Sequence, residues 1–349
     1  MTAANVQTML GYIRRRPIQS SFLLDMFVKE RNVHATKSLV LDQVFGGSEI
    51  APFVSRKSSG HVVGKDGYTS ITHVTPYIKE KVIYDEEDAD IREPGTTGFD
   101  GLASIDALIA RNLDKLDLGI VGQEERQLAE AIQDGVVTVS GEGVSYTIDF
   151  QQLSAHKVEL TGANRWPTIL AAGTATDLYA AANANLRTWC QLPMASGSPM
   201  PNVLIGDVNT TTLIKTAFAS QLDNRRVDYG RIKPELLDRY NATYEGDIWG
   251  TGYSLKVFTY QGYYKIDGSS SNYIGDHILV LGNTQAYVSL EYGKISNMQA
   301  KANGFRGRRF PNRWIEPDGS AEYVTLESAP MIHLREPRAF VRAHVTAAA

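Results

Sequence analysis

Hydrophobic residues recur at steps of three and four along residues 100–134, which is the longest regular pattern in the chain. This spacing places one apolar stripe along an α-helix. The stripe consists of Ile105, Leu108, Ile109, Leu113, Leu116, Ile120, Leu128 and Ile132. Gly135 follows as a C-terminal cap would. A helix of roughly 34 residues would be about 50 Å long, and Gly119 and Gly122 predict a bend or break within it.

Residues 54–84 are instead rich in Thr, Val, Ile and Tyr, which predicts two long strands joined at residues 64–67. Neither face of this hairpin is wholly apolar, because Ile78 and Val82 share a side with Glu80. A two-stranded hairpin is marginal in water, and ordering about 40 residues costs roughly 1 kcal/mol of backbone entropy each. We therefore expect the hairpin to need another chain to lie on. Deleting residues 58–82 should then leave a soluble, folded protein that cannot assemble with other chains.

Shorter patterns predict a mixed α+β protein. Residues 20–32 suggest a short helix with Phe22 and Phe27 on its apolar face, and residues 36–45 suggest a strand. Residues 136–141, 144–150 and 157–160 suggest short antiparallel strands. Thr176 and Asp177 suit the start of a helix, after which strands and helices mix as far as residue 282. Residues 322–345 suggest two strands that return to the sheet beside the long helix.

Composition limits the classes of function. The chain has 349 residues, of which 43% are hydrophobic, and this is enough for two or three packed units. A net charge of -4 gives no overall basic field for nucleic acid or a membrane surface. No apolar run reaches the ~18 residues of a membrane span, and no signal peptide is recognisable, so we expect a soluble protein. The single cysteine, Cys190, excludes an intrachain disulfide and is expected to be a small buried residue.

Catalytic and metal-binding motifs are absent from the sequence. The seven histidines are scattered, and there is no HExxH, GxSxG or GxxxxGK[ST]. His277 beside Asp276 is more typical of a surface or core histidine than of a general base, and a pair such as Glu124-Glu125 is expected in a chain with 39 acids. We therefore predict no catalytic, cofactor-binding or metal residues. A soluble carboxylate-dependent hydrolase stays as an alternative hypothesis.

Two charged segments are candidates for contacts with partners. Residues 303–314 interleave arginines with aromatic residues; the arginines are Arg306, Arg308, Arg309 and Arg313. Such a mixture can bind single-stranded nucleic acid or form a protein interface, and a single patch on an acidic chain favours the interface. Residues 84–90 hold a run of acids that forms either a solvated base of the hairpin or a contact with a basic patch on a neighbouring subunit.

The most specific segments are "LGNTQAYVSLEYG" and "RRFPNRWIEPDGSAEYVTLESAPMIHLREPRAFVRAHV". Together with "SSFLLDMFVKE", "PFVSRKSSGHVV" and "DGVVTVSGEG", they resemble the major capsid (head) proteins of lambda-like phages, of the capsid protein E type. The resemblance implies the α+β Hong Kong 97-type fold of tailed-phage major capsid proteins. Its parts would be an N-terminal arm with a short helix (1–53), an extended hairpin loop (54–94), a peripheral domain with the spine helix (95–165 and 291–349) and an axial domain (166–290).

The resemblance further implies a protein without cofactors that assembles with itself into pentamers and hexamers. These would form an icosahedral phage head around double-stranded DNA, without sequence-specific contact and without a membrane. Scaffolding, portal and decoration proteins would be its other partners. The turn at 282–285 would join the axial to the peripheral domain, with Gly282 and Asn283 tolerating a positive φ. Lys57, Lys65 and Lys79 would be solvated rather than cross-linked, and residues 223–244 match the family least.

Overall fold

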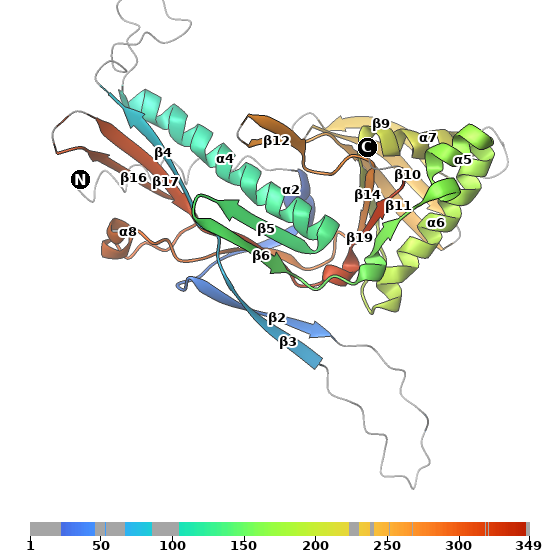
Figure 1. Ribbon diagram of the computed structural model, residues 1–349, viewed down its shortest axis with the longest axis horizontal. Coiled ribbons are helices and arrows are strands. Elements are labelled where there is room, and N and C mark those ends of the chain that lie inside the picture. The colour runs from blue at the N-terminus through green and yellow to red at the C-terminus, as the bar shows by residue number, and fades with distance from the viewer. Residues whose placement is uncertain are drawn as a thin grey trace, which may run out of the picture.

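The computed structural model describes residues 22–45, 53, 67–85, 105–222, 230–237, 241–250, 252–266, 268–317, 319 and 321–346. These residues form a mixed α+β fold. A long helix, α4, lies across one half of the molecule, and a larger sheet covered by helices α5, α6 and α7 forms the other half (Figure 1). Within the described chain, no helix combines the length and the hydropathy that crossing a membrane requires.

Helix α4 (Ile105–Asp134) is uninterrupted over 30 residues, so it is about 45 Å long. The predicted break at Gly119 and Gly122 is therefore wrong. Both glycines instead leave room for a neighbour, because a Cβ built at Gly119 would lie 3.2 Å from the Glu80 carboxylate and one at Gly122 would lie 3.2 Å from the Tyr273 hydroxyl. Packing on both sides holds the helix straight at a local cost of about 1 kcal/mol per glycine.

Two three-stranded sheets lie against α4, with the strand orders β16-β17-β4 and β1-β15-β18. The strands are β16 (Phe310–Ile315), β17 (Glu322–Ser328), β4 (Ile78–Tyr84), β1 (Val28–Val33), β15 (Val288–Tyr292) and β18 (Pro330–Leu334). Leu113 and Ile120 of α4 share one buried cluster with Val324 and Leu326 of β17. The periodic stripe of the sequence is thus the face that α4 turns toward the sheets.

The larger sheet has seven strands in the order β7-β19-β14-β8-β11-β10-β9. They are β7 (Lys157–Glu159), β19 (Val341–His344), β14 (Ile278–Gly282), β8 (Val203–Gly206), β11 (Tyr253–Tyr260), β10 (Ala242–Gly250) and β9 (Gly230–Leu237). β7 runs parallel to β19, so the expected antiparallel strand at 157–160 is wrong. Since β7 and β19 come from outside residues 166–290, this sheet extends beyond the expected axial segment.

Helices α5 (Trp166–Ala172), α6 (Ala175–Ala195) and α7 (Val208–Leu222) pack on this sheet through a second core. α6 begins two residues earlier than Asp177 suggests. Thr174 is its N-cap, and Asp177 completes a capping box by accepting a hydrogen bond from the Thr174 backbone at 2.7 Å. β9 lies within residues 223–244, the stretch that matches the family least, and β10 begins there and extends to Gly250.

The predicted hairpin exists with a different pairing. β3 (Gly67–Val74) pairs with β2 (Ser38–Phe45), and the two strands extend away from the body of the molecule (Figure 1). Residues 78–84 do not continue β3 but form β4, which pairs with β17. The expected single strand over 68–84 is therefore wrong, and Pro76 lies at the break. Residues 54–63, with Lys57, and Lys65 lie outside the described residues.

The N-terminal segment also differs from its prediction. Helix α2 (Phe22–Phe27) ends after six residues, and the polar residues that follow it form β1, which runs parallel to β15. Residues 322–345 contain three strands, β17, β18 and β19, each in a different sheet. The prediction of two strands that both return to the sheet beside the long helix is therefore wrong. The remaining elements are the hairpin of β5 (Val136–Gly141) and β6 (Val144–Asp149), the hairpin of β12 (Tyr263–Ile266) and β13 (Ser269–Asn272), and helix α8 (Met298–Ala302).

Candidate functional site

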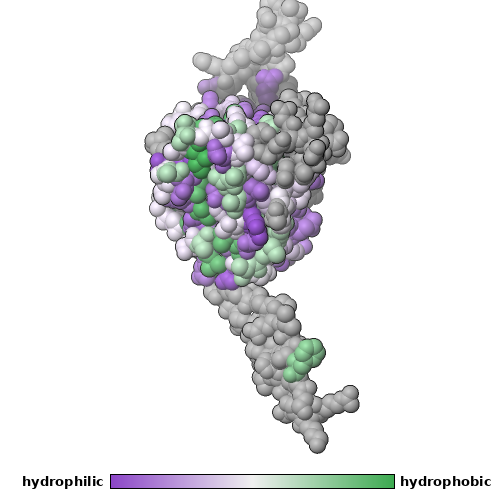
Figure 2. All heavy atoms as spheres, turned by 90° about the vertical axis from the view of Figure 1, so that its right-hand side faces the viewer, coloured by the Kyte–Doolittle hydropathy of each residue, from purple (hydrophilic) through white to green (hydrophobic). Residues whose placement is uncertain are grey.

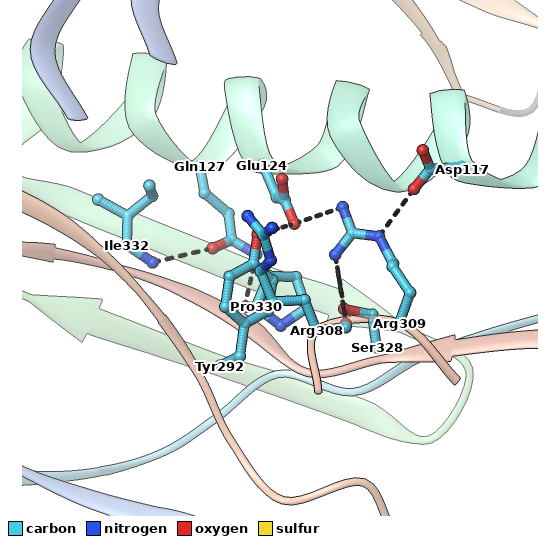
Figure 3. A network of polar contacts seen from close by, with 9 residues as sticks. All are labelled: Asp117, Glu124, Gln127, Tyr292, Arg308, Arg309, Ser328, Pro330 and Ile332. Atoms are coloured by element: carbon cyan, nitrogen blue, oxygen red, sulfur yellow. Dashed lines mark hydrogen bonds and ion pairs between the residues drawn. The ribbon is translucent and has the colours of Figure 1, made fainter. Parts of the chain in front are cut away.

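Arg309 belongs to residues 303–314, which we call the basic segment. Its side chain points toward α4 and contacts polar and aromatic side chains (Figure 3). Its Nε lies 2.9 Å from Asp117 Oδ1 and its Nη2 lies 2.8 Å from Glu124 Oε1. Its Nη1 donates to Ser328 Oγ at 2.9 Å, and the guanidinium carbon lies 5.5 Å from the centre of the Tyr292 ring. The side chain is only 9% exposed. The site therefore joins α4 to both sheets through one buried cation.

At this site one guanidinium lies between two carboxylates of α4. Asp117 and Glu124 are seven residues apart and so lie two turns apart on one face of α4. Burial alone would lower the pKa of Arg309, but Glu124, Tyr292 and Asp117 raise it above its ordinary value. Tyr292 also donates to Glu124 Oε1 at 3.0 Å, and burial raises the pKa of its hydroxyl. The guanidinium is therefore permanently charged and is committed to its own subunit.

The next turn of α4 binds the backbone where β17 passes into β18. Gln127 donates from Nε2 to the Pro330 carbonyl at 3.3 Å and accepts at Oε1 from the Ile332 amide at 3.3 Å (Figure 3). Both groups are buried. Because an unpaired buried amide or carbonyl is costly, Gln127 fixes the register of this crossover against the helix.

Glu125 faces a different part of the molecule. Its carboxylate accepts from the backbone amides of Leu23 and Leu24, at 2.9 and 3.0 Å, and from the Tyr260 hydroxyl at 2.8 Å. Burial raises its pKa to about 7, although these three donors lower it. Adjacent glutamates thus hold two distant segments on different sides of α4. Nothing in the sequence beyond the pair itself indicated this.

The basic segment is only partly available to a partner. Arg313 pairs with Glu322, Trp314 stacks on Tyr323 at 5.2 Å, and Phe310 is fully buried. The hypothesis that residues 303–314 form one arginine-aromatic surface is therefore wrong for Arg309 and Arg313. Arg306 is exposed whereas the Arg309 side chain is buried, so the arginines of this segment do not share one surface.

The turn at 282–285 is held by its own chain. Asn202 Nδ2 donates to Thr284 Oγ1 at 2.9 Å, and Asn202 Oδ1 accepts from the Thr284 amide at 2.9 Å. Asn283 Oδ1 accepts from the Gln285 amide at 2.7 Å. Neither Gly282 nor Asn283 has a positive φ, contrary to the expectation. Gly282 is required for space, because a Cβ there would lie 2.8 Å from the Phe340 ring.

The turn joins β14 of the large sheet to β15 of a sheet on α4. The Thr284 and Asn283 side chains are used in internal bonds, so the turn links two parts of the fold. This agrees with the structural role expected for it.

Cys190 and His277 are the remaining candidates from the sequence. Cys190 is buried, and burial raises the pKa of its thiol to about 12. His277 has a φ of 65°, and the adjacent Asp276 accepts a hydrogen bond at Oδ1 from Asn272 Nδ2 at 2.8 Å. Among the described residues, no Asp, Glu, His and Cys side chains come together in a group that could hold a metal ion.

Lys79, one of the lysines considered for cross-linking, forms an ion pair with Glu327 at 3.0 Å. Glu327 also accepts from the Tyr77 hydroxyl at 2.5 Å and from Asn297 Nδ2 at 2.9 Å. The Lys79 ammonium is therefore held by a carboxylate of its own subunit. This supports the expectation that it is not cross-linked, which stays a prediction.

We call the two-stranded ribbon of β2 and β3 the β2–β3 arm, and its root is the end at Ser38 and Val74. The root borders a cleft of about 810 Å³. In it, His34 Nε2 lies 2.6 Å from Glu291 Oε2, and Glu291 Oε1 accepts from Ser289 and Asn32 at 2.5 and 3.3 Å. Burial would raise the pKa of Glu291, but these hydrogen bonds lower it overall. The Thr75 amide donates to the Lys37 carbonyl at 3.0 Å and closes the root.

Residues 5–345 match the family described as Phage major capsid protein E. The major capsid protein of Escherichia phage lambda is 25% identical over 334 residues, which cover 91% of this chain and 92% of that protein. The major capsid protein of Enterobacteria phage P21 is 26% identical over 345 residues, which cover 95% of this chain and 96% of that protein.

A crystal structure of a capsid protein from a prophage of E. coli CFT073 has a similar fold. It superposes with a TM-score of 0.73 at 19% identity, over 98% of this chain and 99% of that chain. The likeness extends over the helix α4, the sheets on it and the seven-stranded sheet together.

Proposed function

Because this chain belongs to the phage major capsid protein E family, we propose that its copies form the pentamers and hexamers of an icosahedral head around double-stranded DNA. Its function is that of the major capsid protein of a tailed-phage head. It is a structural component of the virion that assembles with itself, not an enzyme, so the hypothesis of a carboxylate-dependent hydrolase is wrong.

The observation that carries the proposal for assembly is the β2–β3 arm. Val40 and Val74 are 63% and 56% exposed on it, whereas Leu39, at its root, is 6% exposed. β2 and β3 pair only with each other among the described strands. Since a two-stranded ribbon is marginal in water, the arm gains stability when it lies on a neighbouring subunit, as a shell provides.

The division into domains follows the Hong Kong 97-type plan in our proposal. α4 and the two sheets on it form the peripheral domain, and the seven-stranded sheet with α5–α7 forms the axial domain. β7 and β19 are part of the seven-stranded sheet and so of the proposed axial domain. In the sequence, however, they lie in the segments 95–165 and 291–349 that were expected to form the peripheral domain. The two units would then share strands, and this favours a subunit that enters the shell as one body.

The axial end of the subunit suits contacts at the centre of a capsomer. Figure 2 shows this end, on which hydrophobic residues form patches between hydrophilic ones. Met194 and Val208 are among the exposed hydrophobic residues of α6 and α7, at 54% and 44% exposure. Exposed apolar patches mark interaction surfaces. Scaffolding, portal and decoration proteins would bind other surfaces of the shell.

The proposal is tested by the mass of the purified protein. Expressed wild-type protein should give capsomers, tubes or closed particles in electron micrographs and by light scattering. A small closed oligomer at every concentration would contradict it. The nucleic-acid-binding alternative predicts salt-dependent affinity for single-stranded DNA, but two of its four arginines, Arg309 and Arg313, are already paired within the subunit.

A further inference from the structure

A hollow of about 180 Å³ lies where the end of β1, the segment after β15, α8 and residues 304–307 meet. Four of its lining residues are cationic or can become so: His34, Lys294, Lys301 and Arg306. None of the lining residues is acidic. We call this hollow the basic pocket. It is built from one chain, and all of its lining residues are among those that the structure describes.

Three of these cations stand apart from the carboxylates that the structure describes. Lys294, Lys301 and Arg306 are exposed, and no ion pair joins them to another described residue. His34 differs from them, because its Nε2 lies 2.6 Å from Glu291 Oε2. Since like charges gathered around a concave surface raise the local potential, the basic pocket attracts an anion.

Contacts within the chain hold the walls of the basic pocket in place. The Lys294 amide donates to the Thr36 carbonyl at 2.9 Å, which ties the segment after β15 to the segment after β1. The Phe305 amide donates to the Ala300 carbonyl at 2.9 Å, and the Phe305 ring lies 5.0 Å from the buried Phe310 ring. The backbone that carries the cations is therefore formed before a ligand arrives, and this lowers the entropic cost of binding.

The lining of the basic pocket also selects the kind of anion. Lysine and arginine side chains carry hydrogen-bond donors and no acceptor. Apart from His34, the other lining residues are glycines, alanines and the apolar Val33, Ile295 and Phe305, whose side chains form no hydrogen bonds. The pocket therefore suits a group whose polar atoms are all acceptors. A carboxylate holds its two oxygens in one plane, whereas the oxygens of a phosphate are arranged tetrahedrally and face cations on several walls.

We propose that the basic pocket binds a phosphate group. The Arg306 guanidinium is able to pair with two phosphate oxygens at once, and Lys294 and Lys301 act as point charges. The hollow is several times larger than the roughly 30 Å³ that a water molecule occupies in the liquid, so the group fits inside it. The source of the phosphate is either the backbone of the packaged DNA or free phosphate in solution. The site is complete within one subunit, so only the DNA source rests on the proposed function.

The first experiment titrates inorganic phosphate into the full-length protein at constant ionic strength and follows binding by phosphorus NMR. The wild type should show saturable binding. Lys301→Ala with Arg306→Ala, which we call the pocket variant, should weaken it at least about tenfold, equivalent to about 1.4 kcal/mol. Its thermal melt should stay unchanged, because both side chains are exposed. The matched control, Lys256→Ala with Lys265→Ala, removes two exposed charges outside the pocket and should bind phosphate as the wild type does.

The second experiment separates the two sources of phosphate. Fluorescence anisotropy measures the affinity of the same three proteins for a short labelled DNA duplex at several salt concentrations. If the DNA backbone occupies the pocket, the pocket variant should bind the duplex more weakly than the control does. Its slope of log affinity against log salt should also be shallower by up to about 2, at roughly 0.9 for each lost phosphate contact. If free phosphate is the ligand, the pocket variant and the control should bind the duplex equally.

Two results of the phosphate titration would overturn the inference. These are the absence of saturable binding in the wild type, and an equal loss of binding in the pocket variant and the control. If the pocket variant then also failed to form particles while the control formed them, the pocket would belong to a contact between subunits. A wild type that formed no particles would contradict the proposed function instead, and phosphate binding would still decide the role of the pocket.

Discussion

The β2–β3 arm and the middle of helix α4 differ in how completely their groups find partners within the subunit. Val40 and Val74 of the arm are more than half exposed, while Glu124 and Glu125 of α4 are 2% and 0% exposed. Each glutamate is nonetheless bonded to segments more than one hundred residues away. The body is therefore held by contacts within its own chain, and the exposed arm is where we propose that a neighbouring subunit binds.

The largest effect should come from removing the arm. Leu39 pairs with His73 and Val40 with Thr72, so replacing residues 40–72 by Asn-Gly would close the root with a two-residue turn. We expect a folded subunit that forms no closed shell, because the body keeps its contacts. Circular dichroism and electron microscopy would measure both properties. An unfolded variant, or one that still forms shells, would contradict the difference between arm and body.

The deletion of residues 58–82 that the sequence suggested is a poorer test. It would remove most of β4, together with Ile78 and Val82, which pack on the core under α4. Such a variant should unfold for reasons unrelated to assembly.

Arg309→Met should have the largest effect on the stability of the body. It leaves the Asp117 and Glu124 carboxylates without their cation, and breaking a buried pair costs about 3–5 kcal/mol. Urea denaturation would measure the loss. The control Arg313→Met removes a more exposed pair, with Arg313 28% exposed, and should cost about 1 kcal/mol or less. Adding Glu124→Gln to Arg309→Met should recover part of the loss, and equal losses for both arginines would contradict the distinction.

Glu125 predicts a pH dependence of stability. Its pKa rises from 4.5 in the unfolded chain to about 7 in the fold, so the folded state binds the proton more tightly. The free energy of unfolding should therefore fall as pH rises from 4.5 to 7, by an amount on the order of 3 kcal/mol. The difference in free energy of unfolding between the wild type and Glu125→Gln isolates the contribution of Glu125, because the other titrating groups contribute equally to both proteins. A difference that stays constant from pH 4.5 to 7.5 would contradict the burial of this carboxyl.

The smallest effects separate two glycines of the body. Gly282→Ala places a Cβ 2.8 Å from the packed Phe340 ring and should cost about 1–3 kcal/mol in a thermal melt. Gly119→Ala meets only the end of the flexible Glu80 side chain at 3.2 Å, and the better helix propensity of Ala offsets this by about 1 kcal/mol. We expect little net change there. A larger loss at Gly119 than at Gly282 would show that the helix depends on that close approach.

Local patterns predicted the elements better than their partners. The stripe on α4, the strand at 38–45 and the β5–β6 hairpin follow from spacing, because one face of each meets the core or its neighbour. The pairing of β3 with β2, and the separation of β4 from β3, did not follow. Pro76 was an available signal, because proline interrupts a strand, and the alternation of apolar with charged residues over 78–84 fits a sheet that packs on one face.

The buried charges show why the candidate site could not be predicted. Asp117, Glu124 and Glu125 have the composition of a solvated helix face, and Arg309 lies 192 residues from Asp117 in the chain. Only the packing of β16 beside α4 shows that these groups meet. The resemblance to the capsid family supplied the fold and function without locating this site.

The sequence by itself determined which segments could be helix or strand, that no catalytic motif is present, and that a long segment near the N-terminus has no apolar face of its own. Those properties depend on residues that are close together in the sequence. The tertiary structure decided which strands pair and which charges are buried. These properties depend on contacts between segments that are distant in the sequence. Such contacts stabilise the protein only once folding has brought the segments together.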